Sequence, residues 1–210
     1  MSLILASTSP RRRELLALLG LLFDVKSPSF EERLVADRPA IEQVMSFAQG
    51  KAQSVAKQEP EAIVLGSDTV IELDQRVLGK PADLVEARAM LRRLAGRDHY
   101  VHTAVALACF ARAIDVVGVS TTVVRMKRFD ERVYERYLAT GESLGKAGAY
   151  SIQGAGGDLV DSIAGDFPTV VGLPLRLVSQ LMTQAGVRVP IDLDQLYVTK
   201  PYANWARFPG

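Results

Sequence analysis

Residues 62–69 read AIVLGSDT, an apolar run that changes abruptly to Gly, Ser, Asp and Thr. Consecutive apolar residues bounded by such a change predict a short, fully buried strand at residues 62–65. In open α/β sheets, residues that follow the carboxyl end of a buried strand line the ligand-binding crevice. We therefore expect Asp68 to lie in a functional site just beyond this strand, where it would hold a cation or accept a proton from water. A carboxylate that only fixes a turn is the structural alternative.

Strands and helices alternate on both sides of this stretch. Strands are predicted at residues 3–6, 23–26, 70–73, 76–78, 101–110, 114–124 and 169–172, and helices at residues 10–19, 39–57, 84–94, 130–141 and 174–185. This alternation predicts an α/β fold with a mixed sheet flanked by helices. We expect one domain at residues 1–187. Residues 188–210 form a polar, proline-punctuated C-terminal extension that would be a packed segment, an oligomer arm or partly disordered.

Composition limits the classes of function. Lys and Arg number 25 against 24 Asp and Glu, for a net charge of +1, which argues against broad binding to nucleic acid. No apolar run is long enough for a transmembrane helix, and no secretory leader is visible. The single cysteine, Cys109, fits a reducing compartment, so we expect a cytoplasmic protein. Two histidines, His99 and His102, are too few for a His/Cys metal site and are expected to be structural or surface groups.

Cationic side chains recur at positions that suit a phosphate ligand. Residues 7–13, STSPRRR, join a strand to a helix N-terminus, where Ser7, Ser9, Arg11 and Arg12 would add donors to backbone N–H groups. Lys51 projects from the apolar stripe of its helix and must therefore reach a partner or a cleft. For residues 7–13, the structural alternative is an ordinary capped helix with exposed arginines.

Three further segments complete the set of candidate residues. Lys80 precedes a proline, which favours an extended backbone that would let it reach into a cleft. Glu32 belongs to a carboxylate pair suited to an oxygen-preferring cation such as Mg²⁺. In the small-residue loop at 145–154, Gln153 offers a donor and an acceptor suited to a pyrimidine edge. A surface turn, a solvated acidic turn and a flexible loop are the respective structural alternatives.

Together these segments resemble the Maf, or septum-formation-inhibitor, family of nucleotide pyrophosphatases. The resemblance rests on LASTSPRR at 5–12, Lys51 with Ala52, GSDT at 66–69, GKP at 79–81, KAGAYSIQG at 146–154 and VGLP at 171–174. The resemblance implies an elongated mixed sheet with two lobes around a central cleft, a Maf or ITPase-like arrangement. It also implies hydrolysis of a nucleoside triphosphate between the α and β phosphates, a divalent cation (Mg²⁺ or Mn²⁺) and a homodimer.

The resemblance also assigns roles to residues of this chain. Asp68 and Glu32 are expected to be catalytic and metal-binding, and the substrate-binding positions are Ser7, Ser9, Arg11, Arg12, Lys51 and Lys80. The specificity positions, Arg11, Thr69 and Gln153, fit the dTTP/UTP subgroup, with modified pyrimidine triphosphates as further candidate substrates. Two residues depart from expectation: Gly50 predicts a bend in its helix that would aim Lys51, and Ser151 stands where glycine is common.

Two rival functions remain open on the sequence alone. The first is a pyrophosphatase for purine or methylated nucleotides. The second is a regulator of cell division that binds nucleotide or protein without hydrolysing it. A complete set of carboxylates and cations argues against the second, because a binding module does not need both.

Overall fold

The strand predicted at residues 62–65 is longer than its apolar pattern suggested. In the computed structural model, which describes residues 2–208, strand β3 runs without interruption over Ile63–Leu73. Asp68 therefore lies in the middle of a strand and not after its end, which corrects the expectation. Strand β1 (Leu3–Ala6) pairs in parallel with β3 only as far as Gly66, so Asp68 still lies just beyond the carboxyl end of that neighbour.

The strands form one mixed sheet of seven strands in the order β2-β1-β3-β5-β6-β7, with β4 paired to β3. The strands not yet given are β2 (Asp24–Lys26), β4 (Arg76–Leu78), β5 (Asp98–Cys109), β6 (Ile114–Met126) and β7 (Val160–Ala164). Strands β2, β1 and β3 run parallel, whereas β5, β6 and β7 pair antiparallel. The α/β prediction of an elongated mixed sheet flanked by helices is confirmed.

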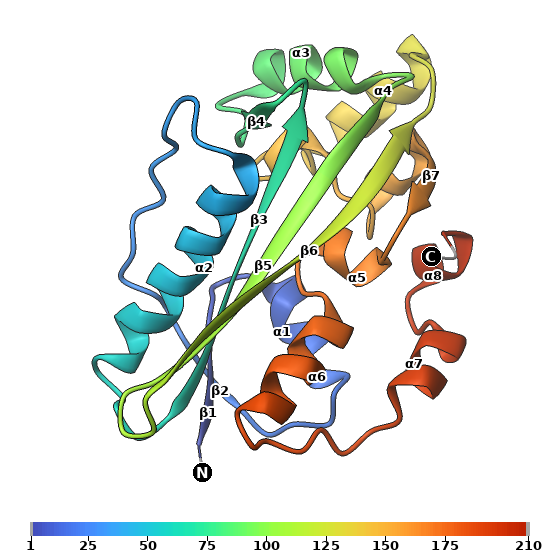
Figure 1. Cartoon of the computed structure of the whole chain (residues 1–210). Helices are drawn as coiled ribbons and strands as arrows, with labels where there is room; N and C mark the ends of the chain where they lie inside the picture. The colour runs from blue at the N-terminus through green and yellow to red at the C-terminus, as the bar shows by residue number, and fades with distance from the viewer. Residues whose placement is uncertain (1, 209–210) are drawn as a thin grey trace.

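Helices cover both faces of this sheet (Figure 1). They are α1 (Pro10–Ala17), α2 (Ala40–Ala56), α3 (Leu84–Leu94), α4 (Glu131–Ala139), α5 (Phe167–Val171), α6 (Leu175–Gln184), α7 (Leu193–Thr199) and α8 (Ala203–Arg207). Val64 packs into the cluster beneath α2, and its neighbours Ile63 and Leu65 pack into the larger cluster on the opposite face. Residues 62–65 are uniformly apolar because both faces of their strand are buried.

The strand predicted at residues 169–172 is wrong, because this segment belongs to helix α5. Asp166 caps the helix and accepts a hydrogen bond from the Thr169 backbone N–H, and Pro168 occupies its first turn. These end signals override the β propensity of a Thr-Val-Val run. The strand that completes the sheet is instead β7, which the sequence analysis missed.

Gly50 does not bend its helix, contrary to the expectation from its position. Helix α2 continues through it to Ala56, and a Cβ on Gly50 would lie 2.1 Å from the Phe30 ring. Gly50 therefore gives the ring of Phe30 room against the helix. The strands predicted at residues 70–73 and 76–78 pair as an antiparallel hairpin, with positive φ angles of 53° at Asp74 and 61° at Gln75 in its turn.

The described part of the C-terminal extension, up to Phe208, packs against the domain. Trp205 is 1% exposed and belongs to the larger core cluster. Cys109 is buried and free. Within residues 2–208, no helix is long and apolar enough to cross a membrane.

Candidate active site

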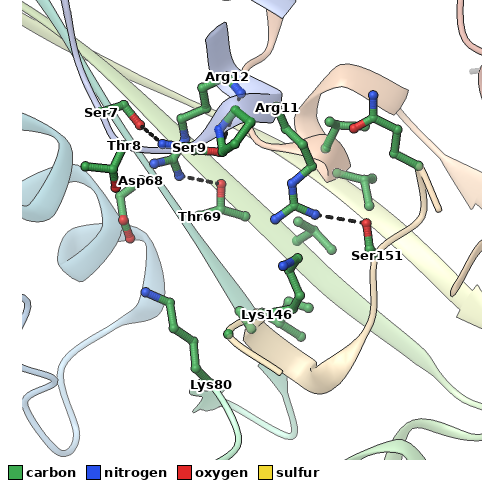
Figure 2. Close-up of a pocket in the computed structure, with 18 of the residues that line it drawn as sticks. Ser7, Thr8, Ser9, Arg11, Arg12, Asp68, Thr69, Lys80, Lys146 and Ser151 are labelled. Carbon is green, nitrogen blue, oxygen red and sulfur yellow. Dashed lines mark hydrogen bonds between the residues drawn. The ribbon is translucent and has the colours of Figure 1, made fainter. Parts of the chain in front are cut away.

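One cavity of about 810 Å³ is lined by all the residues that the sequence proposed for the site. Figure 2 shows part of this set, with Ser7, Ser9, Arg11, Arg12, Asp68, Thr69 and Lys80 labelled. It lies between residues 27–32 with α2 on one side and residues 142–154 on the other, with β3 as its floor. The proposed residues that line it are Ser7, Ser9, Arg11, Arg12, Glu32, Lys51, Asp68, Thr69, Lys80 and Gln153. Residues from six separate stretches of sequence thus converge around residues 68–69 of β3, just beyond the last residue of β3 that pairs with β1.

The loop between β1 and α1 presents hydroxyl groups and arginines to the cavity. Ser9 caps α1 by accepting a hydrogen bond from the Arg12 N–H, and Ser7 Oγ accepts one from the Ser9 N–H at 3.1 Å. The Arg12 side chain turns back over the sheet, where Nε donates to Gly172 O at 3.0 Å and Nη2 to Thr69 Oγ1 at 3.3 Å. Burial lowers the pKa of Arg12, and the charges of Asp68 and Glu32 oppose that shift.

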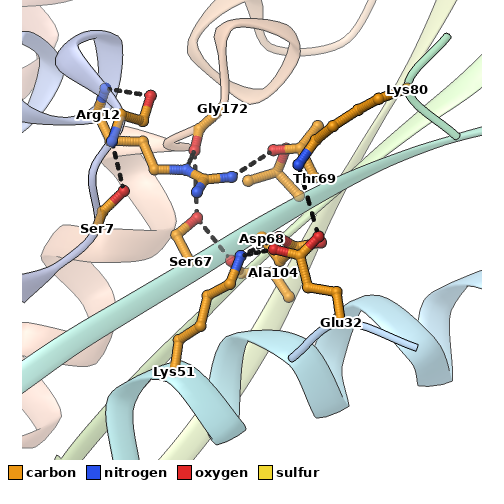
Figure 3. Close-up of polar contacts among 12 residues, drawn as sticks. Ser7, Arg12, Glu32, Lys51, Ser67, Asp68, Thr69, Lys80, Ala104 and Gly172 are labelled. Carbon is orange, nitrogen blue, oxygen red and sulfur yellow. Dashed lines mark hydrogen bonds and ion pairs between the residues drawn. The ribbon is translucent and has the colours of Figure 1, made fainter. Parts of the chain in front are cut away.

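A buried lysine joins the two candidate catalytic carboxylates (Figure 3). Lys51 Nζ lies 2.5 Å from Asp68 Oδ1 and 2.5 Å from Glu32 Oε1. Lys80 lies 3.7 Å from the other oxygen of Glu32, and Lys80 is mostly exposed. The prediction that Lys51 needs a partner is thereby confirmed, since both Lys51 and Asp68 are buried.

The two carboxylates have opposite pKa shifts. Burial raises the pKa of Asp68, and the repulsion of Glu32 adds to this, against the lowering effects of Lys51 and Arg12. Burial also acts upward on Glu32, but its hydrogen bond to Lys51 and the charges of Lys51 and Lys80 prevail and lower its pKa. Asp68 is therefore the better proton acceptor of the pair, because a raised pKa lies closer to the pH at which an enzyme operates.

The other end of the cavity is shaped by the loop at 145–154. Arg11 Nη1 donates to Ser151 Oγ at 2.9 Å, so the serine that departs from the expected glycine serves as an acceptor. Gln153 Nε2 lies 3.4 Å from Glu14 Oε2 at the cavity wall. The Thr69 hydroxyl also lines the cavity, and it lies 2.9 Å from the hydroxyl of Thr103.

Sequence reasoning missed two acidic residues at this end, Glu14 and Glu142. Glu142 Oε2 accepts a hydrogen bond from the Gly156 N–H at 3.2 Å, and a Cβ on Gly154 would lie 1.9 Å from Glu142 Oε1. Glu142 also opposes the lowering of the Arg11 and Lys146 pKa values that burial causes. The available signal was a glutamate after the glycine that ends α4, next to the small-residue loop.

The donor set suits a hard divalent cation only in part. Asp68 and Glu32 provide the carboxylate oxygens that Mg²⁺ or Mn²⁺ prefers. Among residues 2–208, no group of three or more His, Cys, Asp or Glu side chains is arranged to hold a metal ion. The residues present therefore fit a cation held jointly with the phosphates of a substrate, as is usual for Mg²⁺. The two histidines contribute nothing to it: His99 pairs with Tyr150, and His102 with Thr121 and Glu72.

Known proteins are similar to this chain over most of its length. The family model described as Maf-like protein matches residues 2–185. A protein of Symbiobacterium thermophilum named dTTP/UTP pyrophosphatase is 49% identical over 185 residues, which cover 88% of this chain and 94% of that protein. One of Moorella thermoacetica with the same name is 45% identical over 187 residues, covering 89% and 96% of the two chains. The structure of the Staphylococcus aureus Ham1 protein aligns at a TM-score of 0.48 and 14% identity, covering 96% of this chain and 100% of that one.

Proposed function

The chain belongs to the Maf-like protein family, and on that basis we propose that it hydrolyses dTTP and UTP to the nucleoside monophosphate and pyrophosphate. The observation that carries the proposal is the Glu32–Lys51–Asp68 cluster, in which Lys51 and Asp68 are buried and which shares one cavity with the arginines of the β1–α1 loop. Relatives that align with this chain over nearly their whole length are named for this activity.

The proposed chemistry follows from the positions of the charges. Water attacks the α-phosphorus while Asp68 accepts its proton, and the bond from the α-phosphorus to the bridging oxygen breaks, so that pyrophosphate leaves. Arg12, Lys51 and Lys80 stabilise the negative charge that develops on the leaving group. A Mg²⁺ or Mn²⁺ ion, held by Asp68, Glu32 and the substrate's phosphates, would supply further charge neutralisation and a more acidic water.

Base selection belongs to the opposite end of the cavity. Gln153 has an amide that can both donate to and accept from a pyrimidine ring, and Arg11 and Thr69 complete the proposed specificity set. Ser7 and Ser9 are proposed to contact the phosphates with the β1–α1 loop. We also propose a cytoplasmic homodimer without nucleic-acid or membrane partners, in which the domain of residues 1–187 contains the chemistry.

The experiment is pyrophosphate release from dTTP, UTP, CTP, GTP, ATP and 7-methyl-GTP with Mg²⁺, with Mn²⁺ and with EDTA. We expect metal-dependent release from dTTP and UTP, and a loss of at least about 100-fold in Asp68→Asn. Asp161→Asn is the matched control, because Asp161 is an exposed carboxylate on β7. Near-full turnover by Asp68→Asn would refute the role of Asp68.

The substrate panel separates the rival functions. Turnover of purine or methylated nucleotides alone would replace the pyrimidine assignment. Nucleotide binding without turnover of any substrate, by a folded protein, would favour the non-hydrolysing regulator.

A further inference from the structure

The C-terminal extension reaches the wall of the nucleotide cavity. The family match ends at residue 185, and α7 and α8 follow it. Figure 1 shows these two helices, in red, at the side of the molecule where α5 lies. Their contacts lead to two segments that each contribute residues to the cavity lining, residues 151–157 through 151–154 and residues 166–172 through Val170 and Val171.

Aromatic packing anchors the extension to α5. The Trp205 ring stacks on Phe167 with ring centroids 5.8 Å apart and 12° between their planes. The Tyr197 ring meets Trp205 edge-on at 5.1 Å, and Phe208 stacks on the same Phe167 ring at 6.4 Å. Trp205 and Phe167 are each 1% exposed, so this contact removes a large apolar area from water.

Polar contacts tie the extension to the cap of α5. Tyr197 Oη donates to Asp166 Oδ1 at 2.7 Å, while the other oxygen of Asp166 accepts from the Thr169 N–H and hydroxyl. Helix α5 ends at Val171, and the carbonyl of the next residue, Gly172, accepts the hydrogen bond from Arg12. The extension thus supports a helix that in turn holds a proposed phosphate-binding arginine.

Asn204 contacts the base-selecting loop directly. Its Nδ2 group donates one hydrogen bond to Ile152 O at 2.8 Å and another to Gly154 O at 2.9 Å. These carbonyls belong to the two residues that flank Gln153. A Cβ on Gly157 would lie 2.6 Å from Asn204 Nδ2, so the amide fills a space that this glycine leaves open. Both amide protons are therefore used on the backbone of one loop.

The loop is consequently held from both sides. From the cavity, Arg11 donates to Ser151; from the outside, Asn204 holds the next carbonyls along the chain. Fixing the backbone on each side of Gln153 restricts the directions in which its side chain can point. A segment that served only to cover the core would need Trp205 but not two hydrogen bonds to this loop.

We propose that Asn204 is a positioning residue for base selection and that residues 188–208 contribute to the nucleotide site. The inference rests on the proposed pyrophosphatase activity and on Gln153 contacting the base. The C-terminal extension, which lies outside the matched family region at residues 2–185, thereby gains a role in base selectivity.

The test is Asn204→Asp in the full chain. This change preserves the size of the side chain and the oxygen that accepts from Arg207 Nη1, but it replaces both donated protons with an acceptor facing two carbonyls. The matched control is Arg207→Gln on the same helix, which removes an exposed ion pair with Asp158 and the hydrogen bond to Asn204 Oδ1 but leaves the two amide protons of Asn204 in place. For each protein, kcat and KM are measured on dTTP, UTP and CTP, together with the melting temperature.

We expect Asn204→Asp to lower kcat/KM on dTTP and UTP by about tenfold, mainly through a higher KM. The ratio of kcat/KM on dTTP and UTP to that on CTP should therefore fall. Arg207→Gln should behave as the wild type. A folded Asn204→Asp protein with wild-type KM values and base preference would overturn the inference. So would an equal loss on every nucleotide that tracks a lower melting temperature, which indicates a structural role alone. A wild-type protein inactive on all nucleotides would instead refute the proposed function.

Discussion

Replacing Lys51 by Met tests whether the buried charge cluster is organised as the structure indicates. The side chain of Lys51 is 8% exposed, and its ammonium group contacts two carboxylates at 2.5 Å each. Methionine keeps the length of the side chain and removes its charge. Asp68 and Glu32 then share the site without the cation that separates them.

The magnitude follows from how deeply each group is buried. Removing one partner of a buried ion pair costs about 3–5 kcal/mol, because the other charge is left unpaired. The Asp68 side chain is 7% exposed, but that of Glu32 is 33% exposed and stays partly solvated. Arg12 also remains nearby. We therefore expect the lower end, a loss of about 3 kcal/mol in the free energy of unfolding at pH 8.

The loss should depend on pH with a definite sign. Burial already raises the pKa of Asp68 in the folded protein, and losing Lys51 removes an effect that lowers it. A carboxyl group whose pKa is higher folded than unfolded destabilises the protein above its folded pKa. That penalty fades as the pH falls towards the unfolded value of about 3.9. The difference between Lys51→Met and the wild type should therefore shrink on acidification.

Urea unfolding at pH 8 and pH 5.5 measures the effect, with Lys57→Met as an exposed control at the end of the same helix. Adding Asp68→Asn to Lys51→Met should recover most of the lost stability at pH 8 while the enzyme stays inactive. Wild-type stability of Lys51→Met at pH 8 would refute the reasoning. A double variant less stable than the single one would refute it too, because the unpaired charge would not be the cause.

Three further outcomes follow from single contacts. Gly66→Ala should lower the free energy of unfolding, measured by chemical denaturation, by about 1–3 kcal/mol, because its Cβ would lie 2.4 Å from Ala48 O. Gly79→Ala, whose Cβ would have nothing within 4 Å, should lower it far less. Equal losses in the two variants would contradict the close packing of α2 on β3. Burial lowers the pKa of His99 to about 4, so the wild type should lose stability relative to His99→Leu as the pH falls from about 6.5 towards 4. If the unfolding free energies of the two proteins change in parallel with pH, protonation of His99 is not the cause. A non-hydrolysable dTTP analogue with Mg²⁺ should raise the wild-type melting temperature more than it does with EDTA, and an equal rise would exclude joint binding of metal and nucleotide.

Much of the fold was predictable because local patterns and tertiary packing agree. The apolar stripe of α2 is buried, and the strands predicted at residues 70–73, 76–78, 101–110 and 114–124 correspond to observed strands. The error at residues 169–172 arose where they disagree. The β-branched run at residues 169–171 favours a strand, but the Asp166 cap and Pro168 begin a helix there, and packing stabilises that helix.

The sequence by itself indicated ten of the residues that line the candidate site, because their local chemistry suits phosphate or metal binding, although Asp68 lies within a strand and Lys51 within a helix. It did not indicate Glu14 and Glu142. It could not supply the partners of the site residues either. The position of Lys51 between Asp68 and Glu32, 17 residues from one of them along the chain, depends on α2 packing across β3. The hydrogen bonds of Asn204, 50 residues from Gly154, depend on where the extension docks. Contacts between distant segments carry no local periodicity, so only the tertiary structure decides them.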